Sequence, residues 1–185
     1  MGGAKPTLAL NGRMLISYPL AALSGALGTV AVVAKRDSKL PALPGVEVWT
    51  EPDEPRHPLT GIVHALRVAE GRPVMVCAVD LPLAGADLVR SLAFAERGAA
   101  PAVVACGDHR LQPTLACYAA AALDPLSAAL KQPGRPLTEV VRALEPKLVE
   151  VPDRDQLLNI NTPADLARAE AILDRRGRRQ PNVKS

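Results

Sequence analysis

Continuous apolar runs alternate along this chain with helical patterns. Runs rich in β-branched residues are typical of strands buried on both faces of a sheet, and they occur at residues 28–36, 46–52 and 74–83. Between residues 59 and 69 the apolar residues recur at the i, i+3, i+4, i+7 spacing of one helix face, and Pro58 suits the first helical position. The chain therefore begins a strand, helix, strand order.

The remaining segments continue this alternation. An Asn-Gly pair in "TLALNGRML" predicts a hairpin turn, and two strands are expected around a polar turn in residues 101–118. Further helices are expected at residues 15–26, interrupted or restarted at Pro19, at 86–96, 120–131 and 136–144, and from Pro163 to about Arg175, with a short strand at 147–151. We predict an α/β, Rossmann-like fold with a mostly parallel sheet and helices on both faces.

Composition narrows the class of protein. Hydrophobic residues make up 48% of the 185 residues but aromatic residues only 2%, so binding of single-stranded nucleic acid by stacking is nearly excluded. The net charge of +3 includes five positive charges and no acid in residues 175–185, which leaves −2 on the rest. We predict one domain over residues 1–174 and a basic, disordered tail over 175–185, with no nucleic-acid partner.

The three cysteines, Cys77, Cys106 and Cys117, lie in apolar runs without metal-ligand spacing. They are typical of small buried residues in a reducing compartment. No apolar stretch is long enough to cross a membrane and no leader pattern stands at the N-terminus. We therefore expect a cytoplasmic protein with no membrane partner.

Asp80 ends the apolar run "VMVCAVD" and is followed by Leu-Pro, which stops the strand. Ligands of parallel sheets bind beyond the carboxyl ends of the strands. A carboxylate there is suited to holding Mg²⁺ against a nucleotide phosphate. The alternative is an aspartate that only caps the turn or the next helix.

Asn159 and Asn161 are two residues apart in "LLNINTPADL", so on an extended segment both side chains point to one face. Thr162 and Asp165 form a version of the capping box for the helix that starts at Pro163. Capping explains the threonine and the aspartate. It leaves the two asparagines as candidates for ligand or metal contact.

Asp53 lies in a proline-rich loop, "PDEPRHPLTG", ahead of the helix that begins at Pro58. The free N–H groups and dipole of that helix start, Pro58 to Gly61, would suit an anion, although such helix starts are common. The histidines have no partner typical of a catalytic base or a zinc site, and His57 is interpreted as loop or capping chemistry.

The chain opens with "MGGAKP". Gly2 and Gly3 would allow close approach of the backbone to phosphate, and Lys5 could neutralise charge on a leaving pyrophosphate. Alone, this is a weak signal. It gains weight from the other motifs.

Five segments occur in the order and spacing of one family: "MGGAKPTLALNGRMLI", "PDEPRHPLTGI", "CAVDLPL", "LQPTLACY" and "LLNINTPADL". Over nearly the whole chain, to about residue 174, the sequence resembles the molybdenum cofactor guanylyltransferases, the MobA-like nucleotidyltransferases. Its glycine-lysine loop and its Asp-x-Pro strand end are shared with cytidylyltransferases and sugar nucleotidyltransferases.

The resemblance implies a fold of the nucleotide-diphospho-sugar transferase type and transfer of GMP from GTP to the molybdopterin cofactor, with release of pyrophosphate and no covalent enzyme intermediate. It implies that Asp80 holds Mg²⁺ and that Lys5 stabilises the pyrophosphate. Gly2, Gly3 and Asp53 would contact the nucleotide. The substrate pocket would consist of Pro58, Leu59, Thr60, Gly61, Asn159 and Asn161, and cofactor-insertion proteins or molybdoenzyme chaperones are candidate partners.

The sequence departs from the family pattern at its start. The family carries a central strand and a Leu-Ala-Gly-Gly-x-x-x-Arg loop ahead of Met-Gly-Gly, and here that segment is absent. Without a central strand, two neighbouring strands would be unpaired and the domain would lose a large part of its stability. We interpret Met1 as an internal methionine, and we expect a chain extended upstream to bind GTP and turn over.

Two other functions stay open at this stage. One is a cytidylyltransferase for the same cofactor or another nucleotidyltransferase, because the loop that selects the base is missing. The second is an inactive nucleotide-binding or interaction protein. The Asn-x-Asn-Thr-Pro motif favours guanylyl transfer, and pyrophosphate release would separate the enzyme from the binding protein.

Overall fold

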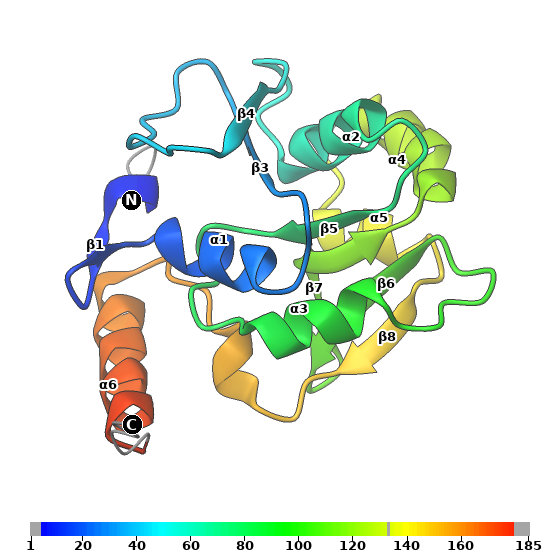
Figure 1. Cartoon of the computed structure of the whole chain (residues 1–185). Helices are drawn as coiled ribbons and strands as arrows, with labels where there is room; N and C mark the ends of the chain where they lie inside the picture. The colour runs from blue at the N-terminus through cyan, green and yellow to red at the C-terminus, as the bar shows by residue number, and fades with distance from the viewer. Residues whose placement is uncertain (1–4, 133, 180–185) are drawn as a thin grey trace.

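The computed structural model describes residues 5–132 and 134–179 (Figure 1). The strands are β1 (Ala9–Leu10), β2 (Arg13–Met14), β3 (Ala31–Ala34), β4 (Glu47–Thr50), β5 (Val74–Cys77), β6 (Ala102–Gly107), β7 (Arg110–Tyr118) and β8 (Lys147–Glu150). The α-helices are α1 (Ser17–Ser24), α2 (Pro58–Val68), α3 (Ala86–Ala93), α4 (Leu123–Leu130), α5 (Leu137–Arg142) and α6 (Pro163–Arg179). Short 3₁₀ helices are η1 (Lys5–Thr7), η2 (Ala120–Ala122) and η3 (Arg154–Leu157).

The main strands form two separate sheets. β3 and β4 pair in parallel, and the larger sheet has the order β5-β7-β6-β8. β3 and β5 both contact α2, yet within the described ranges each has a strand partner on one side only. Among the described strands, β3 and β5 are therefore edge strands.

The larger sheet is mixed, so the prediction of a mostly parallel sheet is wrong in this part. β6 and β8 are parallel, but β7 runs antiparallel to both β5 and β6. A tight turn at Asp108 and His109, both with positive φ, joins β6 to β7. Such a short connection forces the two strands to be antiparallel. The α/β class and the covering helices are as predicted.

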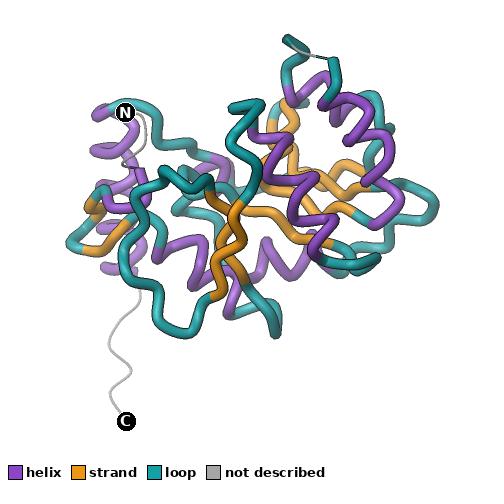
Figure 2. Tube along the Cα trace, turned by 90° about the horizontal axis from the view of Figure 1, so that it is seen from above, coloured by secondary structure: helices purple, strands orange, loops and turns teal. Residues whose placement is uncertain are grey.

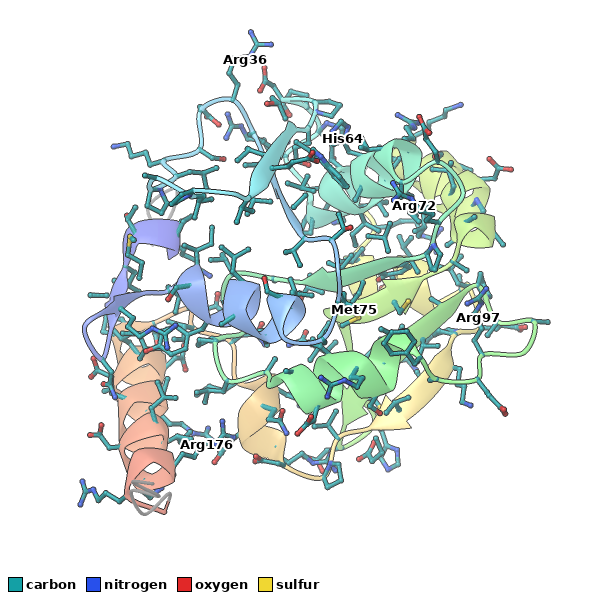
Figure 3. All side chains as sticks on the ribbon, viewed as in Figure 1. Arg36, His64, Arg72, Met75, Arg97 and Arg176 are labelled. Atoms are coloured by element: carbon teal, nitrogen blue, oxygen red, sulfur yellow. The ribbon has the colours of Figure 1, made fainter. Side chains whose placement is uncertain are left out.

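Helices cover both faces of the larger sheet (Figure 1). On one face, α2, α4 and α5 bury an aliphatic cluster against β6 and β7 that includes Leu59, Val104 and Leu126. On the other face, α3 packs against the sheet, and the cluster there includes Leu92 and Leu115. Met75 of β5 lies beside α1 and α3, as Figure 3 shows.

The β1–β2 hairpin packs with α6 at the end of the molecule where the described chain begins (Figures 1 and 2). Its turn residues, Asn11 and Gly12, both have positive φ, as the Asn-Gly signal predicts. Leu10 and Leu15 pack with Ile160 and with α6 residues in one buried cluster. The 3₁₀ helix that contains Lys5 directly precedes this hairpin.

Helices α1, α3 and α6 depart from what the sequence predicted. α1 is continuous, because Pro19 lies in its first turn, where the N–H that proline lacks has no helical acceptor. α3 ends at Ala93, since Phe94 leaves helical conformation. α6 continues past the expected end to Arg179, and Arg176 fastens it by donating to Asp153 (2.7 Å; Figure 3). Residues 175–179, predicted as part of a disordered tail, are therefore helical.

Candidate active site

Lys5, Asp80 and Asn161 meet at one point although they lie far apart in sequence. The Nζ atom of Lys5 donates to Asp80 Oδ2 at 3.1 Å and to Asn161 Oδ1 at 2.7 Å. The side chains of Lys5 and Asp80 are each 22% exposed, so the pair is partly shielded but open to a ligand. An ammonium, a carboxylate and an amide are thus gathered at one end of the sheet.

The main chain places Asp80 just beyond β5. The N–H of Leu81 donates to Ala78 O (3.1 Å), which turns the chain directly after the strand. The N–H of Ile160 donates to Asp80 O (2.8 Å), so the segment that carries Asn161 lies against this turn. Ile160 is fully buried, which fixes the neighbouring asparagine at the rim.

Lys5 is held by the hairpin that follows it. The N–H of Leu8 donates to Lys5 O (3.1 Å), and the N–H of Leu15 donates to Leu8 O (2.8 Å). Tyr18 of α1 donates its hydroxyl to Leu10 O (2.7 Å), and Arg13 stacks over its ring. These contacts tie the start of the described chain to α1.

The predicted capping box is present at the start of α6 and also holds Asn161. Asp165 Oδ2 accepts from the backbone N–H groups of Thr162 (2.8 Å) and Asn161 (3.1 Å), and the N–H of Asp165 donates to Thr162 Oγ1 (3.2 Å). The hydrogen bond from the Thr162 hydroxyl, followed by the two backbone N–H groups, lowers the pKa of Asp165. The helix cap therefore positions a candidate site residue.

Asn159 does not join this group. Its amide nitrogen donates to Leu157 O (3.3 Å), and within the described residues no hydrogen bond joins it to Lys5 or Asp80. Gly2 and Gly3, predicted to contact phosphate, lie outside the described residues. The structure thus brings together Lys5, Asp80 and Asn161.

Asp53 lies at a second location. Together with Arg36, Asp37 and Arg56 it lines a cavity of about 420 Å³ between the loops that follow β3 and β4. The sequence analysis did not single out Arg36, Asp37 or Arg56. The sequence did carry a signal for them, because "AKRD" places three charged residues directly after the apolar run of β3, as Asp80 follows β5.

The start of α2 does not offer the free anion site that was predicted. His57 Nδ1 accepts from the N–H of Leu59 (3.2 Å), and the N–H of Thr60 donates to His57 O (3.0 Å). Pro58 has no N–H to give. His57 is therefore the N-cap of α2, as the sequence predicted. Because the cap satisfies the N–H groups of Leu59 and Thr60, they are not free to bind an anion.

The side chains of the same turn are also engaged. Leu59 is buried in the core, and Thr60, itself 2% exposed, donates its hydroxyl to Pro55 O (2.7 Å). Gly61 faces Glu51, whose Oε2 would lie 3.1 Å from an added Cβ. Neither Leu59 nor Thr60 therefore presents its side chain to a pocket.

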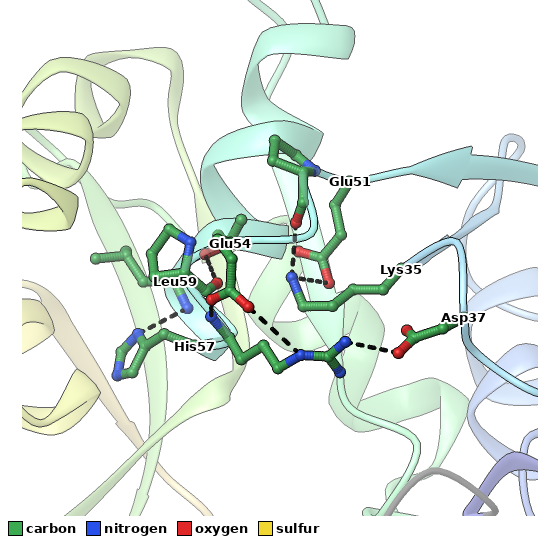
Figure 4. A network of polar contacts seen from close by, with 10 residues as sticks. Lys35, Asp37, Glu51, Glu54, His57 and Leu59 are labelled. Carbon is green, nitrogen blue, oxygen red and sulfur yellow. Dashed lines mark hydrogen bonds and ion pairs between the residues drawn. The ribbon is translucent and has the colours of Figure 1, made fainter.

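Lys35 and Glu51 form a shielded ion pair at the ends of β3 and β4 (Figure 4). Their charged atoms are 3.6 Å apart, with side chains 12% and 13% exposed, and Lys35 also donates to Pro52 O (2.7 Å). Glu51 Oε2 is buried and accepts no hydrogen bond from any described residue. Sequence analysis missed this pair because both residues look like ordinary strand-end charges.

The donor set suits a metal ion that arrives with a nucleotide better than one bound by protein alone. No group of three or more histidine, cysteine or acidic side chains in the described ranges could hold a metal. Asp80 keeps Oδ1 outside its contact with Lys5, and Mg²⁺ commonly takes one or two carboxylates plus phosphates. The residues present therefore fit Mg²⁺ held jointly by Asp80 and phosphate oxygens.

Cys77, the last residue of β5, is the thiol nearest to this site in sequence. Burial, and then the charge of Asp80, raise its pKa to about 12. A thiol with such a pKa is protonated at neutral pH and is a poor nucleophile. The site can thus stabilise charge around a phosphoryl group but offers no activated thiol.

The fold, the site and a family match together give the class of protein. A mixed α/β sheet with helices on both faces (Figure 1) carries a lysine and a carboxylate just beyond the end of β5, where ligands of such sheets bind. A family model described as "MobA-like NTP transferase domain" matches residues 1–148. The chain belongs to this family of nucleotidyltransferase enzymes.

Curated relatives and solved structures agree with the assignment. The molybdenum cofactor guanylyltransferase of Acidiphilium cryptum is 35% identical over 92% of this chain and 88% of that one. The protein of the same name from Cereibacter sphaeroides is 32% identical over 94% of this chain and 90% of its own. The chain therefore spans most of the length of these relatives.

Two solved structures illustrate the fold. Molybdopterin-guanine dinucleotide biosynthesis protein A from Archaeoglobus fulgidus has a TM-score of 0.73 and 27% identity, with 92% of this chain and 91% of that chain covered. The 2-C-methyl-D-erythritol 4-phosphate cytidylyltransferase of Thermus thermophilus has a TM-score of 0.71 at 20% identity, over 94% of this chain and 95% of its own. The second likeness is one of fold alone.

Proposed function

We propose that this protein transfers GMP from GTP to the phosphate of the molybdopterin cofactor, forming a guanine dinucleotide cofactor and releasing pyrophosphate. The observation that carries the proposal is the meeting of Lys5, Asp80 and Asn161 beyond β5. Support comes from the relatives named molybdenum cofactor guanylyltransferase, which match over nearly the whole chain. GTP and the molybdopterin cofactor are the proposed substrates.

The reaction is a single in-line displacement. A terminal phosphate oxygen of the cofactor attacks the α-phosphorus of GTP, and the bond from that phosphorus to the bridging oxygen breaks. Pyrophosphate leaves with the bonding electron pair. No group on the protein is needed as a nucleophile, which agrees with the raised pKa of Cys77.

Lys5 neutralises the charge that builds up on the leaving pyrophosphate, since its ammonium has three donors and the described residues engage two of them. Asp80 orients Lys5 through Oδ2 and is the carboxylate that would hold Mg²⁺. When bound, Mg²⁺ supplies a Lewis acid that offsets phosphate charge. Asn161 fixes the other side of the lysine, and we place it on the pterin side of the site.

No helix of the described chain is long and apolar enough to span a lipid bilayer. The cysteines Cys77, Cys106 and Cys117 are free thiols. Free buried thiols are usual in a reducing compartment. We therefore propose that the reaction takes place in the cytoplasm, where cofactor-insertion or chaperone proteins would receive the product.

The test is pyrophosphate release from GTP and from CTP, in the presence of cofactor precursor and Mg²⁺. We expect release with GTP, and Asp80→Ala should abolish it because the metal-holding carboxylate and the partner of Lys5 are both lost. Asp87→Ala is the matched control, since Asp87 is fully exposed on α3 and contacts Arg90. Turnover that survives Asp80→Ala would contradict the assignment of Asp80.

The same assay separates the alternatives. Release with CTP in place of GTP would identify a cytidylyltransferase. No release with any nucleotide, together with retained nucleotide binding, would identify a binding protein.

A further inference from the structure

The loop that carries Asp80 is held against the C-terminal part of the chain at both of its ends. This loop, residues 80–85, runs from just beyond β5 to the start of α3. At its first residue, the backbone oxygen of Asp80 accepts from the N–H of Ile160 (2.8 Å). At its last residue, the N–H of Gly85 donates to the side-chain oxygen Oε1 of Gln156 (3.0 Å). The two segments therefore run antiparallel, with a contact at each end.

Apolar side chains fill the space between these two contacts. Leu81 and Leu83 of the loop are both buried. Leu81 belongs to the cluster on the α3 face of the larger sheet, which Leu157 also joins, and Leu83 packs with Ile160. Apolar contacts are not directional, so they keep the loop close without fixing its orientation. The hydrogen bonds at its ends supply the direction.

The N–H of Gly85 depends on an acceptor from another segment. Gly85 is the N-cap of α3 with extended backbone, and N–H groups at the start of a helix have no acceptor within it. A Cβ added at Gly85 would lie 3.4 Å from Gln156 Oε1, which shows how closely the two segments approach. Gln156 belongs to η3, so this short helix presents the acceptor to the loop.

Arg176 makes a third contact with the same loop from the last turns of α6. Its Nη1 atom donates to Leu83 O (3.4 Å), and its Nη2 atom donates to Asp153 Oδ2 (2.7 Å). Asp153 also caps η3 by accepting from the N–H of Asp155 (3.2 Å). Figure 3 shows Arg176 on the side of α6 that faces η3. One guanidinium therefore joins the loop, η3 and α6, a task for which the planar fork of arginine is suited.

The position of this loop decides the position of Asp80. In its sequence, "DLPLAG", Asp80 is the one ionisable residue. Asn161, which shares the ammonium of Lys5 with Asp80, directly follows Ile160 in the segment that holds the loop. The contacts of Gln156 and Arg176 therefore fix the two site residues relative to each other.

We infer that Gln156 and Arg176 are positioning residues for the transfer reaction, because they hold the Asp80 loop in the orientation in which its carboxylate meets the metal-bound nucleotide. Both act through the main chain of the loop, at Gly85 and Leu83. The inference rests on the proposed function, in which Asp80 is the carboxylate that would hold Mg²⁺.

The first test is the Mg²⁺ dependence of pyrophosphate release. Gln156→Met keeps the length of the side chain but removes the acceptor for the N–H of Gly85. We expect it to raise the Mg²⁺ concentration at half-maximal rate about fivefold, the ratio that corresponds to losing one hydrogen bond. Gln156→Glu keeps an acceptor and should restore most of the wild-type dependence. Gln132→Met is the matched control, because Gln132 is an exposed glutamine just after α4.

Arg176→Met tests the other contact of the loop. It removes the N–H groups that join Leu83 to Asp153, so we expect a similar rise in the Mg²⁺ requirement. Arg175→Met is the matched control, since Arg175 is an exposed neighbour with the same charge. Circular dichroism would verify that each variant folds. Variants that lose stability but keep the wild-type Mg²⁺ dependence would overturn the inference.

Two further measurements need no turnover. In Gln156→Met without nucleotide, the amides of residues 83–85 should exchange with deuterium about fivefold faster than in the wild type. Binding of Mn²⁺ in the presence of GTP, followed by electron paramagnetic resonance, should weaken by the same factor, because Mn²⁺ takes the same oxygen ligands as Mg²⁺. Unchanged exchange would overturn the inference. So would faster exchange with unchanged Mn²⁺ binding, because the contacts would then only stabilise the loop.

Failure of the inference and failure of the proposed function are distinguishable. If the wild-type protein releases pyrophosphate from GTP and Gln156→Met has the same Mg²⁺ dependence, the inference is wrong and the function stands. If no nucleotide yields pyrophosphate, but Gln156→Met loosens the loop and weakens Mn²⁺ binding with GTP, the positioning role stands and the function is wrong.

Discussion

The thiols of this protein are shielded rather than activated. Burial raises the pKa of Cys77 to about 12 and that of Cys106 to about 11, where the hydrogen bond to Glu150 adds to the effect of burial. Burial also raises the pKa of Cys117. A raised thiol pKa keeps the residue neutral at physiological pH, so none of the three is suited to nucleophilic catalysis.

Thiol titration checks this at the residue scale. At pH 8, Cys77 in the folded protein should contain about a thousandfold less thiolate than in the unfolded chain, since its ordinary pKa is 9.0. Ellman's reagent should therefore react slowly until urea is added. The folded state holds the proton of the Cys77 thiol more tightly than the unfolded chain does. The free energy of unfolding should therefore fall as the pH rises above 9.0. Rapid modification without urea would contradict the pKa assignment.

At the scale of elements, the start of α6 links helix stability to the candidate active site. Thr162 and Asp165 cap the helix, and the same carboxylate fixes the backbone of Asn161. Because the pKa of Asp165 is lowered, the cap stabilises the fold above the ordinary value of 3.8 and is lost as the pH falls below it. The helix cap therefore also supports a candidate site residue.

Thr162→Ala tests this link. It should reduce the free energy of unfolding by about 1 kcal/mol, the usual effect of losing an N-cap side chain. It should also raise the KM for the cofactor more than it lowers kcat, because Asn161 is displaced while Lys5 and Asp80 stay paired. Thr138→Ala on α5 is the matched control, since Thr138 is exposed. An unchanged KM in the Thr162 variant would separate the cap from the site.

At the scale of the whole molecule, the division of the strands into two sheets determines where the fold is weakest. β6 and β7 each have strand partners on both sides, whereas β3 and β5 have one each among the described strands. The residues of β5 are only partly buried, although all are apolar. Unpaired edges of this kind favour local opening and aggregation.

Hydrogen exchange should locate this weakness. Amides of β3 and β5 that point away from their single partner strand should exchange at least tenfold faster than the central amides of β7. β7 is the internal control because it pairs with β5 and β6 in the same sheet. Equal protection in β3, β5 and β7 would contradict a divided sheet.

The sequence alone was sufficient for features that depend on neighbouring residues. The alternation of apolar runs and helical patterns predicted the α/β class, the Asn11-Gly12 turn and the capping box at Thr162, because each follows from local backbone preference. Asp80 was predicted as a candidate because a polar residue that ends an apolar strand lies at the sheet edge. Lys5 and Asn161 were also predicted, but only as separate candidates.

Only the tertiary structure decided which candidates meet. Lys5, Asp80 and Asn161 converge because the β1–β2 hairpin packs on α6 and because the N–H of Ile160 donates a hydrogen bond to the backbone oxygen of Asp80. No local sequence pattern links these segments. Packing also separated Asp53 from Asp80, whereas the closed start of α2 and the reversal of β7 come from a local cap and a tight turn. The local pattern fixes the elements, whereas the free energy of burying their faces against one another fixes the site.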